Sequence, residues 1–312
     1  MPVAANQSHS FPRTAAVSVL ETNRSTCEPE NPVVVPPIPL LGNSRHCVPQ
    51  EKPHIANRYL TVIDLRQALN EWPYDPENDA RVMRGADGRE ILQVRTPVGL
   101  EQYEMDGRPD GTRPHGMESS LAYYQQRLDK AIADGKESDF QLGPEECAEL
   151  FNEGTLYYFR YVRLFQLRDW ARTLRDTSRN LRVFDLVHQH AGRTEDQQFL
   201  EKWRPYIIRV NASAAAMLAL EKPSYEKALT ITNEAIAKIE ALNELDDETF
   251  VFERERSLTA MRELSEQIQK HRPLSEMEKL EQQLRRAIDR QEFERAAQLR
   301  DKIRELRAHK VC

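Results

Sequence analysis

The chain has 312 residues, a formal net charge of −6, and 11 glycines against 18 prolines. This length allows two domains, or one domain with appendages. No glycine follows Gly192, which argues against an all-β fold or a doubly wound sheet and favours helices joined by short connections. The mild acidity argues against bulk, non-specific DNA binding, although a local basic face can still bind.

The sequence predicts a cytoplasmic protein. It contains no run of eighteen apolar residues, so we expect no membrane span. Its first residues lack the charged and apolar regions of a secretory signal. The cysteines are too few and too scattered for a disulfide scaffold; they are Cys27, Cys47, Cys147 and Cys312.

Residues 1–58 are predicted to form a disordered, proline-rich tail. The apolar stretch VVVPPIPLL at residues 33–41 is either a short extended docking peptide or simply part of this tail. Cysteines and histidines share the segment, but their spacing matches no metal-ligand pattern; they are Cys27, His46, Cys47 and His54. We therefore expect no metal site there.

Residues 59–116 are predicted to form a small β-containing region. Residues 59–72 could open as a strand and continue as a helix. Three short β-forming segments follow at 80–84, 89–95 and 100–105, separated by the glycine-containing turns GADG and TPVG. This pattern predicts an antiparallel meander. Because such a sheet is too small to be stable alone, we expect it to pack against helices.

Residues 117–272 are predicted to form a helical body. The expected helices cover 118–134, 144–167, 169–190, 199–220, 224–242 and 246–271. Residues 168–181 align weakly with residues 223–236, an offset of 55. The helix pairs resemble tetratricopeptide-type hairpins in architecture, in which stacking buries faces that one pair leaves open. The expected fold class is therefore mainly α, with a helical-hairpin repeat body.

Residues 273–309 are predicted to form two helices around a turn at residues 290–292. The first helix carries apolar residues at helical spacing, namely Met277, Leu280, Leu284 and Ile288. The second carries Phe293, Ala296, Leu299, Ile303 and Leu306. Both are one-face patterns. A hairpin of this size is too small to have a self-sufficient core, so it should pack on itself, on a second copy or on a partner.

These residues also carry a family resemblance. The run L-x3-L-x2-A-I-x2-Q-E-F-E-x-A-A-x-L-R-D-x-I-x2-L at 280–306 resembles the UVR motif, the UvrB/UvrC interaction module of bacterial nucleotide excision repair. That motif also occurs in ClpC-type chaperones and McsA-type regulators. The resemblance implies an antiparallel hairpin that binds another such hairpin. It assigns partner binding to Leu280, Leu284, Phe293, Glu294, Ala297, Arg300, Asp301 and Ile303.

Spacing alone allows a different role for one of these residues. Apolar stripes on helices are usually core, so Phe293 could fill the interior of the hairpin. The resemblance instead makes Phe293, at the turn, a contact residue for the partner.

The rest of the sequence limits the function that the motif implies. There is no GxxxxGK[ST] phosphate loop, no paired CxxC and no recognisable nuclease region, so ATPase, zinc and nuclease functions of UVR proteins are not expected. The body also resembles bacterial UVR-domain proteins with the segments YLTVIDLRQALNEWPYD and DGRPDG, which implies no activity. We therefore expect a non-enzymatic adaptor without catalytic residues or cofactor, whose partner carries a UVR-type hairpin or is a second copy.

A nucleic-acid-associated accessory of nucleotide excision repair is the main alternative. Four arginines are spaced 3, 4 and 3 residues apart and are expected to form an exposed stripe on one helix, which could dock phosphate, nucleic acid or an acidic partner; they are Arg172, Arg175, Arg179 and Arg182. The stripe could equally be a solvated face, partly neutralised by nearby aspartates. A third alternative is an enzyme whose site is assembled from separate loops.

Overall fold

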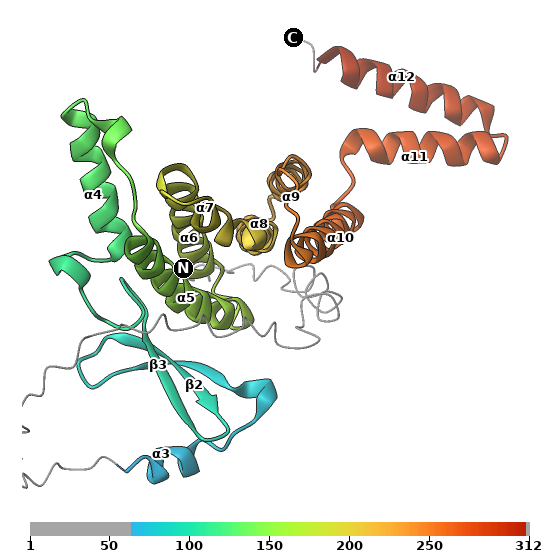
Figure 1. Ribbon diagram of the computed structural model, residues 1–312. Helices are drawn as coiled ribbons and strands as arrows, with labels where there is room; N and C mark the ends of the chain where they lie inside the picture. Colours follow the sequence, from blue (N-terminus) through green and yellow to red (C-terminus); the bar gives the residue numbers. More distant parts are fainter. Residues whose placement is uncertain (1–63, 310–312) are drawn as a thin grey trace, which may run out of the picture.

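The computed structural model describes residues 64–309, which consist mainly of helices with one small antiparallel sheet (Figure 1). The expected fold class, mainly α with a meander and a C-terminal helical hairpin, is confirmed. Predictions for residues 1–58, including the segment 33–41 and the Cys27, His46, Cys47 and His54 group, lie outside the described residues. So does the strand expected to begin at residue 59.

The sheet is a three-stranded meander in the order β1-β2-β3. Its strands are β1 (Ala80–Arg84), β2 (Glu90–Thr96) and β3 (Gly99–Glu104). Leu92 in the central strand lies opposite Val82 on one side and Tyr103 on the other. Gly88 closes the β1–β2 turn with a φ of 81°, a conformation that glycine adopts without steric cost. The glycine-containing turns therefore predicted the strand order correctly.

The two faces of the sheet are covered by different elements (Figure 1). On one face, Leu92 and Val94 are fully buried in a cluster that includes Leu164 of α5 (Pro144–Gln166). On the other face lies the short helix α3 (Arg66–Glu71), where the guanidinium of Arg95 donates to the Trp72 carbonyl over 2.8 Å. The sheet thus gains from neighbouring helices the apolar contacts that three strands alone lack.

Buried arginine–carboxylate pairs fasten the end of the sheet to the helices. Arg160 of α5 is fully buried and donates to both oxygens of Asp176 on α6 (Trp170–His190), over 2.7 and 2.9 Å. The same guanidinium donates to the carbonyls of Glu104, the last residue of β3, and of Gly107 in the loop that follows. One side chain therefore joins two helices and the loop that leaves the sheet.

A second buried carboxylate joins the DGRPDG loop to two helices. Glu153 of α5 is fully buried and pairs with Arg108 of that loop over 2.9 Å. It also accepts hydrogen bonds from the backbone N–H groups of Ser120 and Leu121, at the start of α4 (Ser120–Ala133). A carboxylate at a helix amino end is favoured by the orphan N–H groups there. The DGRPDG segment is thus part of the packing of the body as well as a turn.

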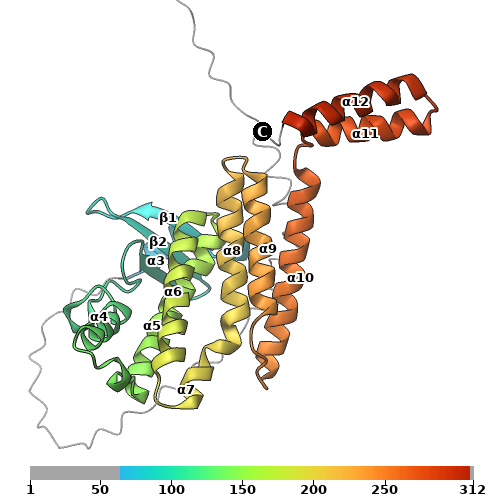
Figure 2. The same cartoon turned by 90° about the horizontal axis from the view of Figure 1, so that it is seen from above.

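The helices from α5 onward lie side by side in a curved layer (Figure 2). Besides α5 and α6 they are α8 (Arg204–Leu220), α9 (Tyr225–Glu240) and α10 (Glu248–His271), while the short helix α7 (Thr194–Phe199) lies at one end of the layer between α6 and α8. The helix expected over 199–220 begins at Arg204 instead, because α7 and the 3-10 turn Glu201–Trp203 precede it. Pro205 sits in its first turn, where a missing N–H costs nothing.

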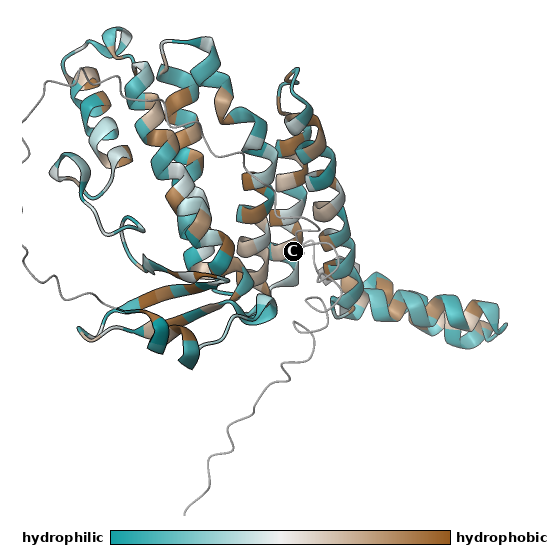
Figure 3. Cartoon of the chain, turned by 60° about the horizontal axis from the view of Figure 1, so that its bottom comes forward, coloured by the Kyte–Doolittle hydropathy of each residue, from teal (hydrophilic) through white to brown (hydrophobic). Residues whose placement is uncertain are grey.

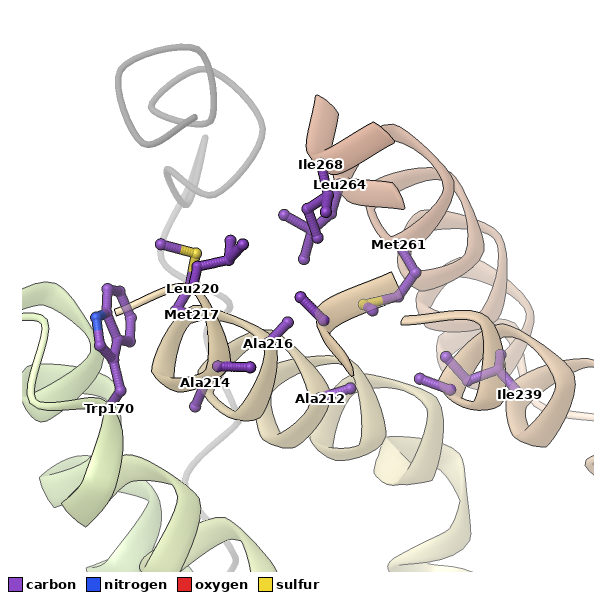
Figure 4. Close-up of a cluster of buried hydrophobic side chains, with 13 residues drawn as sticks. Trp170, Ala212, Ala214, Ala216, Met217, Leu220, Ile239, Met261, Leu264 and Ile268 are labelled. Carbon is purple, nitrogen blue, oxygen red and sulfur yellow. The ribbon is translucent and has the colours of Figure 1, made fainter. Parts of the chain in front are cut away.

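The core of the layer is centred on α8, which packs against α6, α9 and α10. Its alanines let the helices approach closely, and Met217 and Leu220 fill the space towards Trp170 (Figure 4). Because α8 is apolar on most of its circumference, it is a buried helix with neighbours on several sides. The similarity of the helix pairs to tetratricopeptide repeats stays a prediction.

Candidate functional site

The last two helices form an antiparallel hairpin that projects from the end of α10 (Figures 1 and 2). They are α11 (Glu276–Asp289) and α12 (Phe293–His309). A capping box starts α11, in which the Ser275 hydroxyl accepts from the Glu278 N–H and the Glu278 carboxylate accepts from the Ser275 N–H. This local chemistry gives the hairpin a defined first turn.

The turn between the two helices contains no glycine. Gln291 takes the left-handed conformation, with a φ of 61°. Its N–H donates to the Ile288 carbonyl over 2.9 Å, and the Glu292 N–H donates to the Ala287 carbonyl over 2.8 Å. This is the Schellman arrangement that usually has glycine in the place of Gln291. The turn satisfies the last carbonyls of α11 and directs the chain into α12.

The interior of the hairpin is small and apolar. Ala287, Leu299 and Ile303 are buried between the two helices, and Leu280 and Leu284 are half-buried beside them. Ile303, which the resemblance assigned to partner binding, therefore lies inside the hairpin in this chain. In Figure 3 most residues of the hairpin ribbon are coloured as hydrophilic.

Two large apolar side chains are left in water near the turn. Phe293 is 71% exposed and Ile288 is 53% exposed. The alternative in which Phe293 fills the hairpin core is therefore wrong: Leu299 and Ile303 occupy that interior. Ile288 was expected on the inner face of α11, but the helix turns Ala287 inward instead. An apolar pair held in water at a helix junction is suited to burial against another protein.

The remaining predicted contact residues lie along the outside of α12. Glu294, Ala297, Arg300 and Asp301 are all exposed. Arg300 and Asp301 form an ion pair of 3.1 Å whose side chains are more than half exposed, so water weakens it. These groups are available to a partner, and whether they contact one stays a prediction.

The hairpin geometry coincides with a known motif. Residues 275–308 match the UvrB/uvrC motif, UVR. This match confirms the resemblance carried by residues 280–306. No curated protein and no solved structure matches the chain. Among residues 64–309, no helix combines the length and the apolar character that crossing a bilayer needs.

Arg272 connects this UVR hairpin to the body. It caps α10 and pairs with Glu226 of α9 over 2.8 Å and with Glu278 of α11. Hydrogen bonds from the Ser275 backbone and side chain, followed by the one from Arg272, lower the pKa of Glu278 to about 2. The carboxylate that caps α11 therefore stays charged at any physiological pH.

The arginines of α6 do not form the exposed stripe that their spacing predicted. Arg179 is 6% exposed; its guanidinium pairs with Glu153 and lies 4.0 Å from the Tyr157 ring centroid. At this point α6 faces α5, so Arg179, which the spacing predicts to be exposed, is covered. This expectation is therefore wrong for Arg179.

The neighbouring arginines are also engaged by acidic groups. Arg172 pairs with Asp169 and with Glu90 of the sheet, at 2.9 and 2.6 Å. Arg175 pairs with Asp176 and Asp106 at 2.9 and 2.8 Å. Arg182 is exposed. Anion binding by this helix stays a prediction, but most of its arginines already serve to join the sheet and the helices.

Proposed function

We propose that the protein is a cytoplasmic, non-enzymatic adaptor that binds a protein partner through its UVR hairpin. The observation that carries this proposal is the exposure of Phe293 and Ile288 at the tip of a hairpin whose own core is already filled. Burying such side chains against a partner recovers apolar surface that folding leaves in water. The partner of best fit is another UVR-type hairpin, the kind of partner that the match of residues 275–308 to the UVR motif implies.

The chemistry of the described residues supports a binding role. The Cys147 thiol is fully buried, and burial raises its pKa to about 12, so it is protonated and unreactive at neutral pH. The buried carboxylates Glu153 and Asp176 are neutralised by arginines that hold the fold together. These two carboxylates thus have structural partners.

Removal of the hairpin tests the proposal. We expect the full-length protein, used as bait in a lysate of its source cells, to recover proteins that carry a UVR motif. Bait consisting of residues 1–272 should lose them and keep the melting temperature of its helical body. Recovery of the same proteins by both baits would contradict the proposal.

A further inference from the structure

The edge helix α10 has two faces with different surroundings. Its inner face packs against α8 and α9 through Met261, Leu264 and Ile268 (Figure 4). About half a turn away, the outer face lines a surface hollow; its residues are Phe252, Glu255, Arg256, Thr259, Ala260 and Glu263. Since α10 is the last helix of the layer (Figure 2), this outer face is where a further helix would pack.

Two features of this face are unfavourable in an isolated molecule. Phe252 is 59% exposed. Further along, the Oε2 atom of Glu263 and the Oε1 atom of Gln267 are shielded from water, and within the described residues neither accepts a hydrogen bond. An acceptor withdrawn from water without a donor costs about 1–3 kcal/mol, and more when it is charged.

The outer face also carries Arg256, a cation whose ion pair within the chain is long. The Arg256 side chain is 27% exposed, and its ion pair with the buried Glu253 spans 3.8 Å. Arg256 and Glu263 are seven residues, or two helical turns, apart on the same stripe. The stripe therefore offers both a donor in need of a close acceptor and an acceptor in need of a donor.

The spacing of these groups is self-complementary. In an antiparallel pair of α10 helices related by a twofold axis between Thr259 and Ala260, Arg256 of each copy lies opposite Glu263 of the other. The same operation places Phe252 opposite Gln267. The small side chains at the axis allow the helices to approach to the usual 8–10 Å. Because the interface is twofold, each favourable pair of residues occurs twice in it.

We propose that the outer face of α10 is a twofold interface with a second copy of this chain. Across the interface, Arg256 of one copy supplies the donor that Glu263 of the other lacks, and packing of Phe252 beside Gln267 of the other copy removes both phenylalanines from water. This interface is separate from the UVR hairpin, which stays free at the end of each copy. A dimer built in this way displays two hairpins, so binding to a partner with two sites gains from the effective concentration of the second.

Charge exchange in the full-length chain tests this interface, with sedimentation equilibrium as the readout. The wild type is expected to be a dimer. Glu263→Arg and Arg256→Glu should each place like charges opposite one another and raise the dimer dissociation constant at least tenfold. An equimolar mixture of the two variants should form a heterodimer, because each Arg then meets a Glu. Phe293→Ala, in the hairpin, should leave the dimer unchanged.

The mixture makes the test independent of folding defects, because a misfolded variant cannot be rescued by another variant. Circular dichroism melts of each variant provide the matching control. A wild type that is monomeric at roughly 100 µM would overturn the proposal. A dimer that survives Glu263→Arg but is lost in Phe293→Ala would assign self-association to the hairpin instead.

Discussion

Phe293 and Glu153 are held in opposite surroundings, and their substitutions should have opposite effects. Phe293 is mostly in water at the hairpin tip, so its removal should leave the fold intact. Glu153 is fully buried and neutralises Arg108 and Arg179. Its loss leaves positive charge in a region that water does not reach, which is more costly than the ion pair itself is stabilising.

Replacement of Glu153 by Gln should therefore destabilise the protein strongly. Gln keeps the size of the side chain but leaves the buried Arg179 without a carboxylate, whereas Arg108 keeps its ion pair with Asp110. We expect the free energy of unfolding in urea to fall by about 3–5 kcal/mol. Glu145→Gln, at an exposed position of the same helix, should cost below about 1 kcal/mol. Equal losses in the two variants would show that the buried network contributes little.

At the scale of single elements, the hairpin turn shows where sequence patterns mislead. The absence of glycine after Gly192 correctly predicted helices with short connections, yet this stretch still makes a tight left-handed turn, at Gln291 in the hairpin. Apolar spacing placed Ile288 inside the hairpin, although Ala287 is the inward residue. Periodicity locates a stripe to within about one residue, and packing against the second helix decides which neighbour is buried.

Glycine at the turn should stabilise the hairpin. Gln291 has a positive φ, a backbone conformation that costs a residue with a side chain about 1–2 kcal/mol. Glycine avoids this steric cost, but it gives back about 0.5–1 kcal/mol because it loses more chain entropy on folding. Gln291→Gly should therefore slow hydrogen exchange of the Glu292 amide, which bonds to Ala287. Gln298→Gly, in the middle of α12, should accelerate the same exchange. Acceleration in both variants would contradict the left-handed turn.

The start of α11 should resist acid. The pKa of Glu278 is lowered to about 2 from an ordinary 4.5, so its capping contribution is fully present above about pH 4.5 and is lost as the pH falls through about 2. An NMR titration of the Glu278 carboxyl carbon should give this low midpoint. In Ser275→Ala the midpoint should move upward, because one partner of the capping box is gone. A midpoint near 4.5 in the wild type would mean that the capping box does not form.

At the scale of the whole molecule, the sequence predicted the strand order and most helices, because turns and caps are local signals. It did not predict how the sheet is attached. The contacts of Arg160 with Asp176, Glu104 and Gly107 join segments up to 56 residues apart in sequence, and no local pattern reveals such a pairing. For the same reason the sequence predicts that the arginines of α6 are exposed, because several of their acidic partners lie far away in the sequence.

The hairpin and the body should unfold independently. The ion pair that crosses from the body to the hairpin joins Arg272 to Glu278, whose side chain is 35% exposed, and ion pairs near the surface stabilise by at most about 1 kcal/mol. Calorimetry should therefore give the same main transition for the full-length chain and for residues 1–272. A fall of the main melting temperature by 5 °C or more, which is roughly the effect of 1–2 kcal/mol in a domain of this size, would show that the hairpin supports the body.

Phe293→Ala tests most directly whether the exposed hairpin tip binds the partner. The full-length variant should recover at least tenfold less of the UVR-bearing protein that the wild type recovers, since a buried aromatic contact contributes about 2 kcal/mol or more. Its helicity and melting temperature should equal those of the wild type, and Gln298→Ala, an exposed position on the same helix, should bind normally. Undiminished recovery by a folded Phe293→Ala protein would contradict the account.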